Sequence, residues 1–387
     1  MPELPDLSIN HLLDAYRSGK QTPAQVLAAI RVLTDTLVEE NIWIHLLSEA
    51  ETAPYLEALA QHAPDELPLY GIPFAIKDNI DLAGIPTTAG CQAYAYLPER
   101  SAFVVERLLR AGALPVGKTN LDQFATGLVG TRSPYGATRN PFDPDYIAGG
   151  SSSGSAVAVA RGLCSFALGT DTAGSGRVPA AFNNLIGIKP TRGLLSTQGV
   201  VAACRSLDCV SVFTLDCQDA ASVMEVAVAA DPDDPYSRNA QSGQAARETF
   251  RFGLPHDHQL EFYGDTVAEQ LFHDTVEHLR SLGGTAVPID LQPFMEAARL
   301  LYEGPWIAER YAAIESFIEA QPAALLPVTR NIIAAGKKIR AVTCFKARYR
   351  LQELKQKTSR MLATVDFVLT PVSYTHLTLP TTGIRCR

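Results

Sequence analysis

The sequence lacks an excess of positive charge and lacks any long apolar run. Lys and Arg total 33 against 41 Asp and Glu, which gives a formal net charge of −8 at pH 7, and no basic cluster interrupts this balance. Nucleic-acid binding requires concentrated Lys and Arg, so we expect no nucleic-acid partner. No stretch approaches the roughly 20 apolar residues that a transmembrane helix needs, so we expect no membrane insertion.

Paired cysteines and an N-terminal targeting signal are also missing. The seven cysteines are odd in number, irregularly spaced and without a CxxC pair. This pattern argues against both a zinc site and a disulfide framework. Residues 1–6 lack the basic and apolar regions of a signal peptide. We therefore expect a reduced, cytoplasmic setting, with no metal and no cofactor.

What is present is typical of a globular protein with a large core. The chain has 387 residues, of which 47% are hydrophobic and 19% charged. We expect apolar strands and intervening helices over these ranges: 69–76, 102–111, 114–117, 156–161, 165–168 and 185–189. Alternation of strand and helix predicts parallel strand pairing with helices on both faces of a sheet.

Further elements flank this alternation. Ser8 and Thr22 are expected to cap two N-terminal helices, the second through a capping box with Gln25. A strand, a nearby helix and three later helices are expected over the following ranges: 41–47, 49–61, 267–282, 294–318 and 337–363. We expect the N-terminal elements to pack outside the sheet, where a homodimer contact could form.

Two loops rich in glycine and serine stand on either side of a small-residue helix and a short apolar strand. The first reads GGSSSGS over 149–155 and the second reads GTDTAGSG over 169–176. A single loop of this kind is usually a flexible connector, but linkers do not alternate with core-forming elements. A phosphate-binding loop would end in Lys and Ser or Thr, and neither loop does. The alternation predicts that Ser151 and Ser175 lie close together.

A lysine is the candidate base for these serines. None of the eight histidines lies in the serine loops, and His256 and His258 are better explained by a solvated turn than by a metal site. Lys77 stands at the end of the apolar strand expected over 69–76, in a motif that reads GIPFAIKDN over 71–79. Burial there would favour a neutral amine able to take a proton from a serine hydroxyl. An ordinary surface lysine after a strand is the alternative.

These three motifs, in this order and spacing, resemble the amidase signature family of serine hydrolases over roughly residues 8–371. The resemblance implies a single catalytic α/β domain, with a large twisted mixed β-sheet covered by helices on both faces. It implies a Ser-Ser-Lys triad in which Ser175 is the nucleophile, Lys77 the base and Ser151 the proton relay. Backbone N–H groups of the second loop would form the oxyanion hole: Thr172, Ala173, Gly174 and Ser175.

Other residues of the two loops are expected to shape the site. Ser152 and Ser153 are interpreted as loop-shaping hydroxyls, and Ser155 as the cap of the following helix. Asp171 is expected to order the second loop, and Arg177 to tie the helix after the nucleophile to its surroundings.

Two departures from the common family pattern resemble the allophanate hydrolase branch. The second loop carries Ala173 and Gly176 around its serine, and residues 301–310 read LYEGPWIAER. The branch implies that Tyr302 and Arg310 hold the substrate, and an arginine fork suits the carboxylate of allophanate. The expected reaction cleaves the terminal amide through an acyl-enzyme, releasing ammonia and an N-carboxylated carbamate. Urea, s-triazine and guanidine breakdown remain open as pathways.

Alternatives remain open at this point. The amidase subunit of the tRNA-dependent amidotransferase shares the Ser-Ser-Lys core, but the allophanate-type residues weigh against it. An inactive truncated chain or a binding module is a second alternative. Tyr302 and Arg310 could instead be a packed tyrosine and a surface ion pair with Glu303 or Glu309.

The end of the sequence does not resemble the rest. Residues 365–371, VDFVLTP, are expected to form a buried strand, whereas the following residues resemble translated adapter DNA from sequencing libraries. We expect residues 1–371 to be an amidase domain incomplete at its C-terminus, and residues 372–387 to be a non-native tail. Longer family members carry a further domain that assists decarboxylation of the product, so complete conversion of allophanate is not expected.

Overall fold

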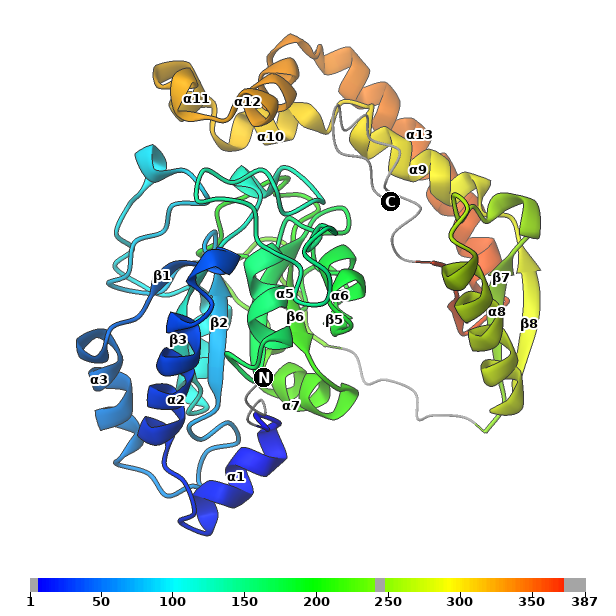
Figure 1. Ribbon diagram of the computed structural model, residues 1–387. Coiled ribbons are helices and arrows are strands. Elements are labelled where there is room, and N and C mark those ends of the chain that lie inside the picture. Colours follow the sequence, from blue (N-terminus) through cyan, green and yellow to red (C-terminus); the bar gives the residue numbers. More distant parts are fainter. Residues whose placement is uncertain (1–5, 241–247, 372–387) are drawn as a thin grey trace. The chain divides into compact units, whose positions relative to one another are not determined.

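The computed structural model describes residues 6–240 and 248–371 (Figure 1). These residues form two compact units. The first contains residues up to 240 together with residues 312–334, and the second contains the remaining residues up to 311 and from 335 onward. The expected tail at 372–387 lies outside the described residues. None of the described helices is both long enough and apolar enough to cross a membrane.

A six-stranded mixed sheet organises the first unit. Its spatial order is β1-β3-β2-β4-β6-β5. Strand β2 pairs in parallel with both β3 and β4, whereas the other pairings are antiparallel. The bounds are β1 Trp43–Leu46, β2 Pro73–Lys77, β3 Leu114–Thr119, β4 Phe166–Asp171, β5 Ile186–Ile188 and β6 Cys209–Thr214.

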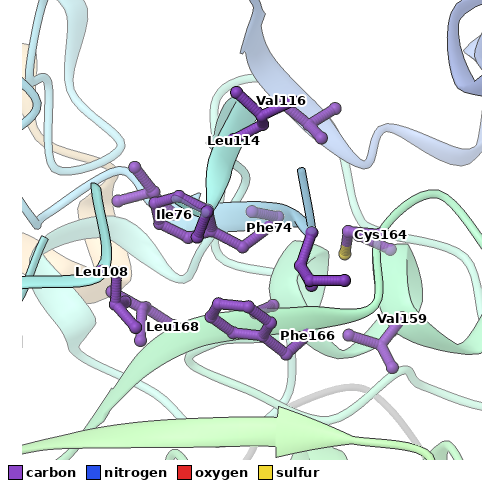
Figure 2. Packing of buried hydrophobic residues seen from close by; sticks show 14 of the residues in the cluster. Phe74, Ile76, Leu108, Leu114, Val116, Val159, Cys164, Phe166 and Leu168 are labelled. Atoms are coloured by element: carbon purple, nitrogen blue, oxygen red, sulfur yellow. The ribbon is translucent and has the colours of Figure 1, made fainter. Parts of the chain in front are cut away.

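The central strands are buried along their whole length, which explains their continuous apolar sequences. Phe74 of β2 and Phe166 of β4 stack with their ring centroids 5.2 Å apart. Ile76, Leu108 and Leu168 belong to the same apolar cluster (Figure 2). Burial on both faces fixes β2 in the middle of the sheet, and with it the position of Lys77 at the carboxyl end of the strand.

Helices cover this sheet. Helix α5 packs against β2, β3 and β4, while α7 packs against β6 and α4. The helices of this unit are α1 Ile9–Arg17, α2 Pro23–Asp35, α3 Glu49–Leu59, α4 Phe103–Arg110, α5 Ser153–Ala160, α6 Val178–Phe182, α7 Cys217–Ala227, α11 Glu315–Ala320 and α12 Pro327–Ala334. The α/β fold class with a mixed sheet, as predicted from the sequence, is confirmed.

Two N-terminal expectations had opposite outcomes at the helix starts. The capping box of α2 is confirmed, because Thr22 Oγ1 accepts from Gln25 N and Gln25 Oε1 accepts from Thr22 N. The prediction that Ser8 caps α1 is wrong, since its side chain makes no capping bond. The buried carboxylate of Asp219 accepts the N–H of Ile9 instead, at 3.1 Å. A tertiary contact has replaced the local cap.

The prediction that the N-terminal elements pack outside the sheet is wrong for residues 41–47. Strand β1 lies within this range and forms an edge of the sheet, antiparallel to β3. Its partially buried residues give too weak a pattern to place it, and pairing with β3 satisfies its backbone groups.

The second unit contains a three-stranded parallel sheet in the order β8-β7-β9. Its strands are β7 Phe250–Pro255, β8 Gly284–Ile289 and β9 Phe367–Val368, and its helices are α8 Thr266–Ser281, α9 Gln292–Tyr302 and α13 Ala341–Leu362. Helix α10 Ile307–Ala313 belongs to this unit up to residue 311. The predicted helix over 294–318 is interrupted at Gly304 and Pro305, since proline cannot donate the next helical hydrogen bond. The short strand expected in 365–371 is present as β9.

Candidate active site

Lys77 and Ser151 lie together in the interior of the first unit. Lys77 Nζ donates hydrogen bonds to Ser151 Oγ at 2.8 Å and to Thr170 Oγ1 at 2.7 Å. The side chains of Lys77 and Ser151 expose no surface, and Thr170 is almost fully buried. Lys77 ends β2 and Thr170 belongs to the adjacent strand β4, so the sheet itself sets the distance between the amine and the hydroxyl of Thr170.

A second buried lysine stands on the neighbouring strand. Lys118 of β3 forms an ion pair with Asp78, with 3.1 Å between Nζ and Oδ1, and both side chains are fully buried. The contact is ionic, because Asp78 Oδ1 has no partner with hydrogen-bond geometry. Burial lowers the pKa of Lys118, and the charge of Asp78 acts in the opposite direction.

The first serine loop leads directly into α5. Ser152 Oγ donates to the carbonyl of Thr170 and accepts its N–H, and Ser153 accepts a bond from the Thr138 hydroxyl. The interpretation of Ser152 and Ser153 as loop-shaping residues is confirmed. The prediction that Ser155 caps the helix is wrong, because α5 has already begun at Ser153. Inside the helix, Ser155 Oγ donates to the Leu168 carbonyl at 2.9 Å.

Asp171 organises the second serine loop, as expected. Its carboxylate accepts the N–H groups of Gly174 at 2.7 Å and Gly176 at 3.0 Å. Arg177 Nε lies 3.0 Å from Asp171 Oδ2, which confirms the expected tie to the following helix. Burial acts to raise the pKa of Asp171, but the Arg177 guanidinium and the two backbone bonds hold it below its usual value.

Ser175 follows this turn and is 5% exposed. Its hydroxyl donates to the carbonyl of Gly127 at 3.4 Å, a long hydrogen bond. The N–H of Gly174, one of the expected oxyanion donors, is directed at Asp171 in this structure. The Thr172 hydroxyl donates to Asp208, which also accepts the N–H groups of Ala203 and Cys204. The backbone of this loop is therefore held on both sides.

Thr170, Asp122 and Asp208 are residues of this site that sequence reasoning missed. Thr170 and Asp208 have the contacts described above, and the N–H of Asp122 donates to the carbonyl of Ser151 at 3.0 Å. Thr170 could have been found from its position in the GTD segment, two residues before Thr172. Nothing in the sequence signals the roles of the two aspartates.

Tyr302 and Arg310 belong to the second unit. Tyr302 is the last residue of α9 and Arg310 lies on α10, and both side chains are partly buried. Their proposed role in holding the substrate stays a prediction.

Fold and site together define an α/β protein whose sheet buries a lysine hydrogen-bonded to a serine of a glycine-rich loop. The chain belongs to the amidase family: the family model described as Amidase matches residues 36–381. This match spans both compact units.

Three relatives illustrate the likeness. Urea amidolyase of Saccharomyces cerevisiae is 47% identical over 94% of this chain and 20% of its own length. The structure of allophanate hydrolase from Kluyveromyces lactis superposes with a TM-score of 0.89 at 42% identity, covering 95% of this chain and 62% of that one. A glutamyl-tRNA(Gln) amidotransferase subunit from Symbiobacterium thermophilum is 39% identical over 79% of this chain and 66% of its own length.

The chain spans about a fifth of the length of the urea amidolyases that it matches. Its likeness to the amidotransferase subunit is lower in identity and covers less of the chain.

Proposed function

We propose that this chain hydrolyses the terminal amide of allophanate and releases ammonia through an acyl-enzyme. The observation that carries the proposal is the 2.8 Å hydrogen bond between Lys77 Nζ and Ser151 Oγ, whose side chains are both fully buried. The likeness to allophanate hydrolase and urea amidolyase over nearly the whole chain supports the choice of substrate.

In the proposed mechanism, Ser175 Oγ attacks the carbonyl carbon of the terminal amide. Its proton passes to Ser151, and Ser151 passes its own proton to the neutral amine of Lys77. Backbone N–H groups of Thr172, Ala173 and Ser175 stabilise the oxyanion that forms. The same relay then returns a proton to the departing nitrogen. Ammonia is released, and the acyl group stays bound to Ser175 Oγ.

Water completes the reaction. Its proton enters the relay through Ser151 as its oxygen attacks the acyl carbon. The relay then returns that proton to Ser175 Oγ as the bond to the acyl carbon breaks, which restores the free enzyme. The products are ammonia and the N-carboxylated carbamate, so one water is consumed for each amide cleaved. No step requires a metal or a cofactor.

Substrate recognition is assigned to Tyr302 and Arg310. Allophanate is small and planar and carries a carboxylate, which a guanidinium binds through two parallel hydrogen bonds. Lysine at position 310 would keep the charge and lose the fork. The likeness to urea amidolyases supports urea breakdown as the pathway, and we propose a cytoplasmic location. A homodimer stays a prediction, which a measurement of mass by light scattering would test.

The test is ammonia release from allophanate, with glutamine supplied in parallel, by the wild type and by Ser175→Ala and Arg310→Lys. We expect the wild type to use allophanate, Ser175→Ala to lose activity by about 10⁴-fold or more, and Arg310→Lys to raise KM by about tenfold or more. Ammonia released from glutamine alone would transfer the assignment to an amidotransferase. Full activity of Ser175→Ala would refute the proposed nucleophile.

A further inference from the structure

We infer that Asp122 is a positioning residue for both serines of the proposed triad, an inference that rests on the proposed function. Asp122 follows β3 and exposes no surface. None of the described hydrogen bonds joins its side chain to either serine. The inference concerns how its carboxylate and its backbone together shape the loop at 121–132.

The carboxylate closes this loop by accepting three backbone N–H groups. Oδ1 accepts the N–H of Arg132 at 2.8 Å. Oδ2 accepts the N–H groups of Gly130 at 3.1 Å and Val129 at 3.2 Å. These donors lie seven to ten residues further along the chain, so one side chain brings the two ends of the loop together. Three such bonds replace the water that a buried carboxylate loses.

The backbone of the same loop holds the first serine. The N–H of Asp122 donates to the carbonyl of Ser151 at 3.0 Å, and the N–H of Gly150 donates to the carbonyl of Leu128 at 2.9 Å. Gly150 and Ser151 of the serine loop are therefore bonded to Leu128, in the middle of the 121–132 loop, and to Asp122, near its start. Movement of this loop would move Ser151 relative to Lys77.

The middle of the loop holds the second serine. Ser175 Oγ donates to the carbonyl of Gly127, whose position depends on the closure of the loop by Asp122. A Cβ atom on Gly127 would lie 2.5 Å from Asp122 Oδ2, and one on Gly150 would collide with the same oxygen. Both glycines thus lie against the Asp122 carboxylate, and neither position leaves room for a side chain.

Backbone strain falls in the same loop. Phe124 and Ala125 are consecutive residues with φ of 51° and 50°, a conformation that residues with a side chain rarely adopt. Gln123 holds the strained turn through bonds to the Gly90 carbonyl and the Leu326 N–H. Strain that the surroundings maintain is often found where a site must be held in one geometry.

The substitution Asp122→Asn tests this inference, because the NH₂ group that replaces one carboxylate oxygen cannot accept an N–H bond. A fluorophosphonate that labels Ser175 gives two readouts in the full chain: the rate constant of labelling and the fraction finally labelled. We expect Asp122→Asn to lower the rate constant and kcat by about 10²-fold, with KM within about threefold and labelling still complete. A purely structural role would lower the labelled fraction and leave the rate constant of the folded protein unchanged.

Asp234→Asn is the matched control. Asp234 is a buried carboxylate of the same unit that accepts the N–H groups of Thr197 and Tyr236 and has no contact with either serine loop in the described bonds. We expect this variant to keep the wild-type labelling rate. A change of less than about tenfold for Asp122→Asn, or an equal fall for both variants, overturns the inference.

Gly127→Ala keeps the test decisive if Asp122→Asn does not fold. The added methyl group pushes on Asp122 Oδ2 without removing the charge, and we expect the labelling rate to fall by about tenfold or more. An unchanged rate overturns the inference. If the wild type is labelled rapidly but releases no ammonia from allophanate, the proposed substrate is wrong. The labelling rates of the variants would still decide the role of Asp122.

Discussion

Lys118 Nζ lies 3.1 Å from Asp78 Oδ1, and neither side chain exposes any surface. Lys118 also donates to the Thr87 hydroxyl at 2.9 Å, and Asp78 Oδ2 accepts the N–H of Thr88 at 3.0 Å. Asp78 directly follows Lys77 in the chain. An ion pair in the interior therefore anchors the segment that carries the proposed base.

Breaking this ion pair should destabilise the protein strongly. Lys118→Met leaves Asp78 as a buried charge without its countercharge, which typically costs about 3–5 kcal/mol of unfolding free energy. The double variant Asp78→Asn/Lys118→Met should recover much of the loss, because no lone charge remains. Urea denaturation measures both. Lys20→Met, which changes an exposed lysine, should stay within about 0.5 kcal/mol of the wild type. Additive effects in the double variant would contradict the coupling.

Loss of the Thr170 hydroxyl should slow the reaction. Thr170 Oγ1 accepts a 2.7 Å hydrogen bond from Lys77 Nζ, so Thr170→Val leaves the amine with one fewer partner to orient it. We expect kcat for ammonia release to fall by about tenfold, the equivalent of one hydrogen bond. Thr170→Ser keeps the hydroxyl and should retain most of the activity. Equal losses in the two variants would contradict the role of the hydroxyl, because Thr170→Ser retains it.

Asp219 should make stability depend on pH. Burial raises the pKa of this carboxyl to about 6, the nearby Asp216 and Asp6 charges act in the same direction, and the bond from Ile9 N opposes them. The folded chain then binds more protons than the unfolded chain between about pH 4 and 6, so this contribution is present at low pH and is lost as pH rises.

The comparison is between the wild type and Asp219→Asn. The unfolding free energy of the wild type minus that of Asp219→Asn should fall by up to about 3 kcal/mol from pH 4 to pH 7. Denaturant titration at each pH measures both free energies. Asp35→Asn, at an exposed carboxylate, should follow the wild-type curve. A difference that rises with pH would mean that Asp219 ionises below its usual pKa.

Sequence patterns located the middle of the sheet because those strands are apolar throughout. The ranges 69–76, 114–117 and 165–168 overlap β2, β3 and β4, each buried along its length. Strand β6 was not foreseen. Its sequence contains Ser211 and Thr214, and it joins the sheet by antiparallel pairing with β4, which lies far earlier in the chain. Pairing between such distant segments has no local signal.

The two serine loops and Lys77 could be predicted because each lies in a short motif, and the three motifs follow one another in a characteristic order and spacing. Asp122 could not, since a polar residue between short turns has no periodicity and its bonds exist only once the loop has closed. Ser8 and Ser155 were misassigned for the opposite reason. Each has a sequence typical of a helix cap, but Asp219 replaces Ser8 as the partner of the first turn, and the hydroxyl of Ser155 bonds to β4.

The placement of Lys77 and Thr170 on adjacent hydrogen-bonded strands has a consequence for durability. Neighbouring strands stay about 4.8 Å apart for as long as their ladder is intact, so thermal fluctuation of the surface loops cannot separate this pair. Opening of the ladder between β2 and β4, whose last pair is Ile76 and Leu168, would let the two strand ends move apart. The rate of deuterium uptake at the amides of these two strands would therefore measure how often the contact between Lys77 and Thr170 is lost in the folded chain.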